Sequence, residues 1–519
     1  MSISRDFCNP KQISVPSYVG LGILGLGLTL RIAQYSTNRS LWYDEAMLAL
    51  NITGRSFIEL MKPLSYNQGA PLGFLFIEKL AVQALGNHEF ILRLFPLVTG
   101  IVSLLVMYKV ANNLLGTAGM LVATGLFAVS GPLVYYTSET KQYSGDALAA
   151  LLLLLIACEC LEIEPHPRHY VALILGGVAC MWISHPAVFV LVGVGLGLAC
   201  NQLLRPDRRR LFWLGLVFLV WLINFGLLYY VSLRHLAANA LQIHYWRWYG
   251  AFMPTSPLRA PTWVLKAFVL MFHNPVGLLG RLATSVGLVV FVVGCLSLMF
   301  RTWQLAVILL VPFLIVLFAS GLEKYPFSGR LLLFLVPATL LLIGQGIDQI
   351  HSLSLKISSQ AALSNCLVLA AFLFYRPTIL AAQTLWHPTM GEHIKPILSY
   401  VKKHKRDTDF VYVYYGAEPA FSYYAQLYNF EQKHYYVGIK ARQEPNKYFE
   451  DLHKLIVYSR VWFVFSHICE PSSAGAFPPC IVREEPYLLQ QLDSLGKKTD
   501  QFQCAGASSY LYSFNSLQH

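Results

Sequence analysis

Charge is scarce in this sequence. Only 13% of the 519 residues are charged, whereas 55% are hydrophobic. In soluble globular domains about a quarter of all residues are charged, so the composition excludes that class and indicates a membrane protein. The first apolar run, 19–32, is not followed by a small-residue cleavage site. We therefore expect a retained helix there, and not a signal peptide.

Cysteine patterns typical of metal sites are absent as well. The ten cysteines are scattered without the C-x2-C pairs that zinc sites use, so no such site is predicted. Three of them, Cys469, Cys480 and Cys504, lie in the polar tail. A disulfide between Cys469 and Cys480 is a candidate if that tail lies outside the cytoplasm, and the odd third cysteine leaves the pairing open.

A nucleic-acid-binding arm is also missing. The net charge is +12, but residues 377–519 hold 14 basic and 13 acidic residues, so an excess of +11 belongs to residues 1–376. The one tight basic cluster, 205–210, lacks interleaved aromatic residues and is typical of a cytoplasmic loop. The charge therefore favours loop topology and phosphate contact, and we predict no nucleic-acid partner.

Long apolar runs dominate what is present. A helix that crosses a bilayer needs about 20 predominantly apolar residues, and eleven segments qualify as probable spans. They fall near 17–35, 91–111, 117–136, 145–161, 169–184, 187–204, 211–233, 276–300, 304–320, 330–348 and 360–375. The predicted fold class is an all-α polytopic membrane protein in contact with membrane lipid. No inverted internal repeat of the kind found in secondary transporters is visible.

A twelfth apolar stretch, 71–85, carries Glu78 and Lys79 at its middle. A charge pair at bilayer depth is expensive, so we expect an amphipathic helix on the membrane surface, with 263–272 as a second one. If 71–85 does not span and the N-terminus is cytoplasmic, the basic cluster 205–210 falls on the cytoplasmic side. The polar tail then lies on the outer face.

The tail 377–519 changes character and is predicted to be a small extracytoplasmic α/β domain, separate from a transmembrane domain over 1–376. Its strand-like runs are 409–415, 434–439, 460–466 and 509–514. Helical patterns lie between them at 392–405, 417–428 and 484–495. Strands that alternate with helices favour an α/β arrangement.

Two adjacent carboxylates, Asp44 and Glu45, follow the first apolar run in the segment LWYDEA at 41–46. Judged by position alone, such a pair is more often a solvated loop than a catalytic site. Trp42 and Tyr43 are aromatic residues of the kind that anchor at a membrane interface, and they would hold the pair at headgroup depth. Asp44 and Glu45 are therefore our candidate catalytic residues.

Four further charged residues lie at predicted helix ends on the same outer face. Arg93 and Arg330 each open a helix, where a guanidinium either snorkels to the interface or grips a phosphate. Glu139 and Lys141 share one short loop, which is either a plain polar turn or part of an aqueous pocket. Glu139 is also a candidate ligand for a divalent metal ion, and no other cofactor is predicted.

The ordered set of motifs resembles that of polytopic membrane glycosyltransferases of the GT-C fold. The similar branch contains protein mannosyltransferases, aminoarabinose transferases and lipopolysaccharide sugar transferases. Asp44 and Glu45 resemble its Asp-Glu motif in the first outer loop. NQGAPLGF at 67–74, followed by Gly86 and Arg93, is similar to its Pro-Pro-Leu…Gly…Arg-Leu pattern, with Ala-Pro in place of Pro-Pro.

Two later segments extend the resemblance over roughly residues 15–350. Residues 132–143 resemble the branch's Ser-Pro…Tyr-Ser-x-Glu-x-Arg-x-Tyr segment, with Glu139, Lys141 and Tyr143 in matching places. Lys141 stands where arginine is usual. YPFSGR at 325–330 resembles the branch's tyrosine-and-arginine segment near the penultimate helix.

The resemblance implies an enzyme whose donor is a sugar on polyprenyl phosphate and whose acceptor is a lipid, glycan or protein hydroxyl. It implies Asp44 as the general base, Glu45 as a supporting acid or acceptor ligand, and inversion at the anomeric carbon. Cationic side chains would stabilise the leaving phosphate. The substrate-binding candidates are Arg93, Glu139, Lys141, Tyr143, Tyr325 and Arg330.

Two alternatives stay open at this point. A polytopic lipid or glycan transporter or flippase without transferase chemistry needs ionisable residues along a path at mid-membrane. The clean interiors of the helices near 145–161 and 211–233 argue against it. A glycan-binding receptor without catalysis would be indifferent to replacement of Asp44 or Arg330.

Overall fold

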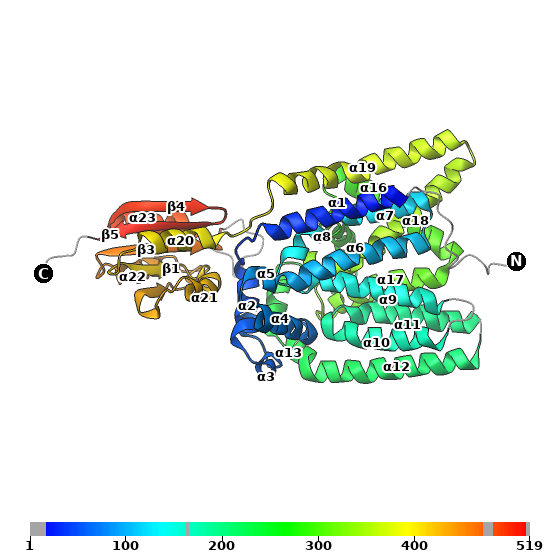
Figure 1. The fold of residues 1–519 in the computed structure, drawn as a ribbon, viewed down its shortest axis with the longest axis horizontal. Coiled ribbons are helices and arrows are strands. Elements are labelled where there is room, and N and C mark those ends of the chain that lie inside the picture. The colour runs from blue at the N-terminus through cyan, green and yellow to red at the C-terminus, as the bar shows by residue number, and fades with distance from the viewer. Residues whose placement is uncertain (1–16, 162–165, 205, 471–480, 515–519) are drawn as a thin grey trace.

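The structure is a computed structural model, which describes residues 17–161, 166–204, 206–470 and 481–514. It consists of a bundle of long helices and a small α/β domain at one end of that bundle (Figure 1). The predicted fold class, a helical polytopic membrane protein with a C-terminal α/β domain, is confirmed.

Nine helices within those ranges are long and apolar enough to cross a membrane, or ten if one bent pair counts as a single span. The nine are α1 (Ser17–Ser36), α6 (Leu94–Leu114), α9 (Tyr143–Cys160), α11 (Ala187–Leu204), α12 (Arg208–Leu228) with η3 (Tyr229–Leu233) and α13 (Arg234–Ala237), α16 (Arg281–Arg301), α17 (Trp303–Gly321), η4 (Gly329–Leu335) with α18 (Val336–Leu355), and α19 (Ser359–Trp386). The bent pair joins α7 (Thr117–Val129) to α8 (Gly131–Tyr135) and η2 (Tyr136–Ser138) at 53°. An apolar helix of 17 residues, α10 (Pro167–Ile183), completes the set. All eleven predicted segments are therefore helical.

Small residues let the central helices pack closely. A Cβ added at Gly294 of α16 would collide with the carbonyl of Leu342, and one added at Gly346 of α18 would collide with the carbonyl of Val290. Such close backbone packing is a main source of helix association in lipid, because the hydrophobic effect does not drive helices together there. The span that contains α18 is 83% buried and α19 is 17% buried, so α18 lies at the centre and α19 at the lipid edge.

Short helices cover the end of the bundle that faces the α/β domain (Figure 1). Those labelled in the figure are α2 (Tyr43–Gly54), α3 (Phe57–Leu60), α4 (Leu72–Leu85) and α5 (Glu89–Leu92). The remaining short elements are η1 (Ser65–Asn67), α14 (Ala240–Trp248) and α15 (Ala260–His273). With 14 residues, α4 is too short to cross a bilayer core. Its charged pair is buried against the neighbouring elements, and Lys79 Nζ donates to the carbonyl of Thr53 at 3.0 Å.

The C-terminal domain is a five-stranded mixed sheet in the order β2-β1-β3-β5-β4. Its elements are α20 (Ile394–His404), β1 (Phe410–Val413), α21 (Glu418–Leu427), η5 (Gln432–His434), β2 (Tyr435–Val437), α22 (Asn446–His453), β3 (Arg460–Ser466), α23 (Glu484–Leu495), β4 (Lys497–Cys504) and β5 (Ala507–Ser513). β1 runs parallel to β2 and β3, while β5 is antiparallel to β3 and β4. The sequence analysis missed β4, because this edge strand is polar and largely exposed.

Helix α19 continues past residue 376 to Trp386, and the α/β domain begins with α20. Cys469 forms a disulfide bond, and its predicted partner Cys480 lies outside the described residues.

The α/β domain is packed firmly onto the start of α2. Leu41 and Ala46 share one buried apolar cluster with Phe421 and Tyr424 of α21. The hydroxyl of Tyr424 accepts a hydrogen bond from the backbone nitrogen of Leu41 at 2.9 Å. The segment that carries Asp44 is therefore held between the bundle and the α/β domain.

Candidate active site

Asp44 and Glu45 lie in the first turn of α2, where the helix dipole favours negative charge. Adjacent residues on a helix point in directions about 100° apart, so the two carboxylates meet different surroundings. Asp44 is 15% exposed and Glu45 is fully buried. The pair is thus split into one partly exposed carboxylate and one that is fully buried.

Asp44 is held between two cations. Its Oδ1 lies 3.1 Å from Lys141 Nζ, and its Oδ2 lies 2.6 Å from Arg330. Gln68 bridges Asp44 and Lys141, since its amide nitrogen donates to Asp44 at 3.0 Å and its oxygen accepts from Lys141 at 2.7 Å. Burial raises the pKa of Asp44, but Lys141 and Arg330 more than offset it and hold the pKa well below its usual range. Asp44 is therefore ionised, and its negative charge is compensated by Lys141 and Arg330.

Glu45 is locked into a different network. It pairs with Arg39 at 2.8 Å and with Arg93 at 2.9 Å, and it accepts from the backbone nitrogen of Thr140 at 2.8 Å. Burial raises its pKa, but the two guanidinium groups dominate and lower it to about 2. Arg93 also donates to the carbonyls of Arg39 and Ser40. This network ties the start of α2 to the 138–140 loop.

Glu139 lies on the other side of Arg330. The nearest atoms of the two side chains are 3.8 Å apart, which is an ion pair but too long for a hydrogen bond. Burial is the largest influence on its pKa, and the carboxylates of Glu45 and Asp44 add to it, so that the pKa rises to about 7 despite Arg330. Glu139 lines a cavity of about 260 Å³ together with Trp42, Arg330 and Glu392.

Arg330 is the hub of the site. It follows Gly329, whose φ of 46° is a left-handed conformation that glycine adopts without strain. Its guanidinium carbon lies 5.5 Å from the ring centres of both Trp42 and Tyr143, which is within the range of cation–π attraction. The side chain remains 25% exposed, so it can meet a ligand.

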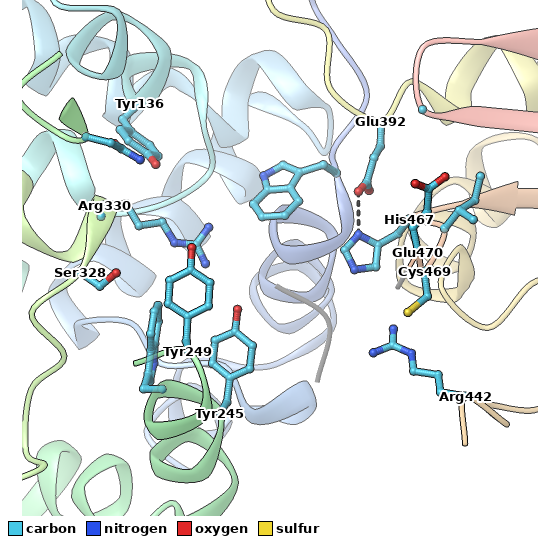
Figure 2. Close-up of a pocket in the computed structure, with 16 residues that line it drawn as sticks. Tyr136, Tyr245, Tyr249, Ser328, Arg330, Glu392, Arg442, His467, Cys469 and Glu470 are labelled. Atoms are coloured by element: carbon cyan, nitrogen blue, oxygen red, sulfur yellow. Dashed lines mark hydrogen bonds and ion pairs between the residues drawn. The ribbon is translucent and has the colours of Figure 1, made fainter. Parts of the chain in front are cut away.

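A cavity of about 620 Å³ lies between the helical bundle and the α/β domain. Figure 2 shows Arg330, Tyr136, Tyr245, Tyr249 and Ser328 on the bundle side, with Glu392, His467 and Arg442 on the α/β-domain side. This volume is within the range of about 300–1,000 Å³ for small-molecule sites. Tyr136 and Asn274 also line a neighbouring cavity of about 530 Å³ along α8 and the lipid-edge helix α19.

The structure brings Asp44, Glu139, Lys141, Tyr143 and Arg330 together. Of these five, Arg330 lines the 620 Å³ cavity and both Arg330 and Glu139 line the 260 Å³ cavity. Two other candidates make their contacts elsewhere. Arg93 is buried and forms an ion pair with Glu45. The hydroxyl of Tyr325 donates a hydrogen bond to the carbonyl of Leu331 at 2.8 Å and so stabilises η4.

The sequence analysis did not select Gln68, Glu392, Arg442 or His467. Gln68 stood within the quoted motif at 67–74. The other three gave no local signal, because they reach the cavity only through the fold of the α/β domain.

The candidate metal role of Glu139 finds little support in its surroundings. Within the described ranges, no group of three or more His, Cys, Asp or Glu side chains is arranged to hold a metal ion. The nearest ionic partner of Glu139 is Arg330, and Asp44 is already neutralised by Lys141 and Arg330. A third cation beside Lys141 and Arg330 would be repelled here, so these residues do not fit a metal ion.

Comparison with known proteins places the fold. No protein-family model matches the sequence, and no curated protein matches it either. ArnT from Cupriavidus metallidurans, solved with undecaprenyl phosphate, is similar in structure with a TM-score of 0.56 and 13% identity over 96% of this chain and 98% of that one. The oligosaccharyltransferase AglB from Archaeoglobus fulgidus, solved with an inhibitory peptide and a dolichol-phosphate, gives 0.52 and 13% over 97% and 75%. Both have the GT-C fold.

Proposed function

We propose that this chain, a polytopic membrane protein with the GT-C fold, transfers a sugar from a polyprenyl-phosphate carrier to an acceptor hydroxyl. The observation that carries the proposal is Asp44, a carboxylate held between Lys141 and Arg330, of which Arg330 lines the 620 Å³ cavity. A base and two cations are what transfer from a phosphate leaving group requires. The polyprenyl phosphates in the ArnT and AglB structures support the choice of carrier.

The reaction is a direct displacement. The acceptor oxygen forms a bond to the anomeric carbon of the sugar while the bond from that carbon to the phosphate oxygen breaks. The polyprenyl phosphate leaves with the electron pair, and the proton of the hydroxyl passes to Asp44. Arg330 and Lys141 stabilise the phosphate charge. A single displacement inverts the configuration at the anomeric carbon.

Donor binding and base strength are coupled in this scheme. Without donor, Lys141 and Arg330 are both engaged with Asp44, and its low pKa makes it a weak base. A phosphate that draws these cations away removes the main cause of the low pKa, so the basicity of Asp44 rises when the donor is in place. Asp44 is therefore activated by the donor and stays inactive without it.

Glu45 and Arg93 take a different role from the predicted one. Their mutual ion pair and their burial support a function in holding α2 against the 138–140 loop, away from substrate. Burial raises the pKa of Glu139, which favours its protonated form. Its carboxyl group can then donate a hydrogen bond to a phosphate or hydroxyl oxygen in the smaller cavity.

We further propose that the reaction takes place on the outer face of the membrane. Helix α1 begins at the end of the bundle far from the α/β domain (Figure 1). With a cytoplasmic N-terminus, as the basic loop at 205–210 favours, the cavity and the α/β domain lie outside the cytoplasm.

The direct test measures donor binding and sugar release with the purified full chain. Undecaprenyl phosphate serves as the binding probe, and several polyprenyl-phosphate sugars serve as donors. Arg330→Gln should weaken binding of undecaprenyl phosphate about tenfold, because a charge-assisted hydrogen bond is lost. Arg247→Gln removes an exposed arginine of an ion pair at the same end of the bundle and is the matched control. Equal affinities of the two variants would contradict the assignment of Arg330.

A further inference from the structure

The loops that follow two of the three parallel strands, β2 and β3, line the large cavity. β1 is the middle one of the three parallel strands, with β2 and β3 on either side of it. Arg442 follows β2 and His467 follows β3 directly, and both line the cavity. In open α/β sheets, ligands bind in the crevice outside the carboxyl ends of the strands, where the strand order changes direction. The α/β domain thus presents its binding edge to the cavity.

His467 is fixed at this edge by two contacts. Its Nδ1 lies 2.7 Å from Glu392 Oε1, and its ring stacks flat on Tyr43 at 4.0 Å between ring centres. Glu392 in turn accepts from the backbone nitrogen of Tyr43 at 3.0 Å. His467 also has a φ of 51°, an uncommon conformation for a residue with a side chain and one that clusters at ligand sites. With Nδ1 engaged, Nε2 is the ring's polar atom for a ligand.

Arg442 is anchored by a second network. Its Nε donates to the hydroxyl of Tyr415 at 2.6 Å, and that hydroxyl donates to Glu484 at 2.6 Å. Tyr448 donates to the same glutamate at 2.5 Å. Such a network restricts the side chain before any ligand binds, which lowers the entropic cost of binding. In Figure 2, Arg442 and His467 lie on the wall across the cavity from Arg330.

The bundle side of the cavity is aromatic. Tyr245, Trp246 and Tyr249 come from α14 and the residue after it, and Trp42 precedes α2. Flat aromatic faces stack on the apolar faces of sugar rings, and their polar edges bond to hydroxyls. On the other wall, the two acidic groups Glu392 and Glu470 outnumber the one basic group, Arg442. A wall without an excess of positive charge favours a neutral ligand with many hydroxyls over a polyanion.

We propose that the carboxyl-end wall of the α/β domain is the acceptor subsite and that the acceptor is a neutral saccharide. The His467–Glu392 pair and Arg442 bind its hydroxyls, and the aromatic residues of α14 stack on its rings. Arg330 is left to the donor phosphate at the opposite wall. That the bound saccharide is the acceptor rests on the proposed function, whereas the binding of a saccharide at this wall does not.

Calorimetry with the full-length protein in detergent tests this assignment. The probes are maltotriose and tri-N-acetylchitotriose, each titrated up to about 10 mM, well beyond the weak end of specific affinities. At least one should bind the wild type, and His467→Gln and Glu392→Gln should each weaken that binding about tenfold. His404→Gln alters an exposed histidine of the same domain and should bind like the wild type. A thermal unfolding scan of each variant separates lost binding from lost folding.

Two results would overturn the assignment. One is that neither trisaccharide binds the wild type. The other is that folded His467→Gln and Glu392→Gln proteins bind as the wild type does. Undecaprenyl phosphate, titrated into the same variants, should bind with the wild-type affinity, because the cation proposed to bind its phosphate, Arg330, lies on the opposite wall. An equal loss of affinity for undecaprenyl phosphate would assign these residues to the donor site. Failure of the proposed transfer reaction is a separate result, since saccharide binding is measured without any donor.

Discussion

Replacing Asp44 by asparagine keeps the shape of the side chain but removes the charge that Lys141 and Arg330 share. In the wild type, a donor phosphate has to draw at least one of these cations away from Asp44, from contacts of 3.1 and 2.6 Å. In Asp44→Asn that competition is gone. We therefore expect the variant to bind polyprenyl phosphate more tightly and yet to transfer no sugar at a useful rate.

The size of both effects follows from the contacts of Asp44 and from the usual strength of such interactions. A hydrogen bond to a charged group is worth about 1.5–3 kcal/mol, so relief from one such contact should tighten donor binding by about tenfold or more. Loss of a general base slows a reaction by about 10²- to 10⁴-fold. The two effects have opposite signs, which separates loss of the base from collapse of the site.

Two assays on the same preparation measure these effects. Binding of undecaprenyl phosphate is followed by calorimetry in detergent, and sugar release is followed at saturating donor, so that tighter binding cannot mask a slower step. Glu323→Gln, which removes an exposed carboxylate paired with Arg247 at the same end of the bundle, is the control and should change neither quantity.

Transfer by Asp44→Asn at close to the wild-type rate would refute the role of Asp44 as base. Weaker binding of undecaprenyl phosphate by a folded Asp44→Asn protein would refute the competition, because the cations would then need Asp44 in order to hold phosphate.

Three further predictions concern stability. Glu45→Gln leaves Arg39 and Arg93 buried without their counter-charge and should lower the free energy of unfolding by about 3–5 kcal/mol, seen as a lower unfolding temperature. The pKa of Glu139 rises on folding from 4.5 to about 7, so between these pH values the folded state binds more protons than the unfolded state. The free energy of unfolding of the wild type should therefore fall as the pH rises through that window, and Glu139→Gln should lack this decline. Asp348 accepts from two backbone nitrogens at the start of α7, and Asp348→Ala should lower the free energy of unfolding by about 1 kcal/mol, whereas an unchanged unfolding temperature would count against the cap.

The helices were the most predictable part of the molecule. Each apolar run in the sequence became a helix, because a segment in lipid must satisfy its own backbone hydrogen bonds and must be apolar along its length. Both properties belong to one stretch of chain. In the tail, β3 was predicted with its bounds because its buried run is apolar, while the exposed edge strand β4 has no such pattern.

The site was predictable only in part. The order of motifs pointed to Asp44, Glu139, Lys141 and Arg330, and the structure brings these four together. The adjacent Glu45 was expected beside the substrate, but it is buried and forms ion pairs with Arg39 and Arg93. Neighbours in the sequence of a helix point about 100° apart, so adjacency does not imply shared surroundings.

By itself, the sequence determined that this protein is a polytopic helical membrane protein with a polar α/β tail, because insertion into lipid depends on the composition of contiguous segments. Only the tertiary structure decided which carboxylate meets the cations and which is buried. Asp44 and Arg330 are 286 residues apart in the chain and 2.6 Å apart in space. A carboxylate's proton affinity depends on charges a few ångströms away, and those distances are set by how the helices pack.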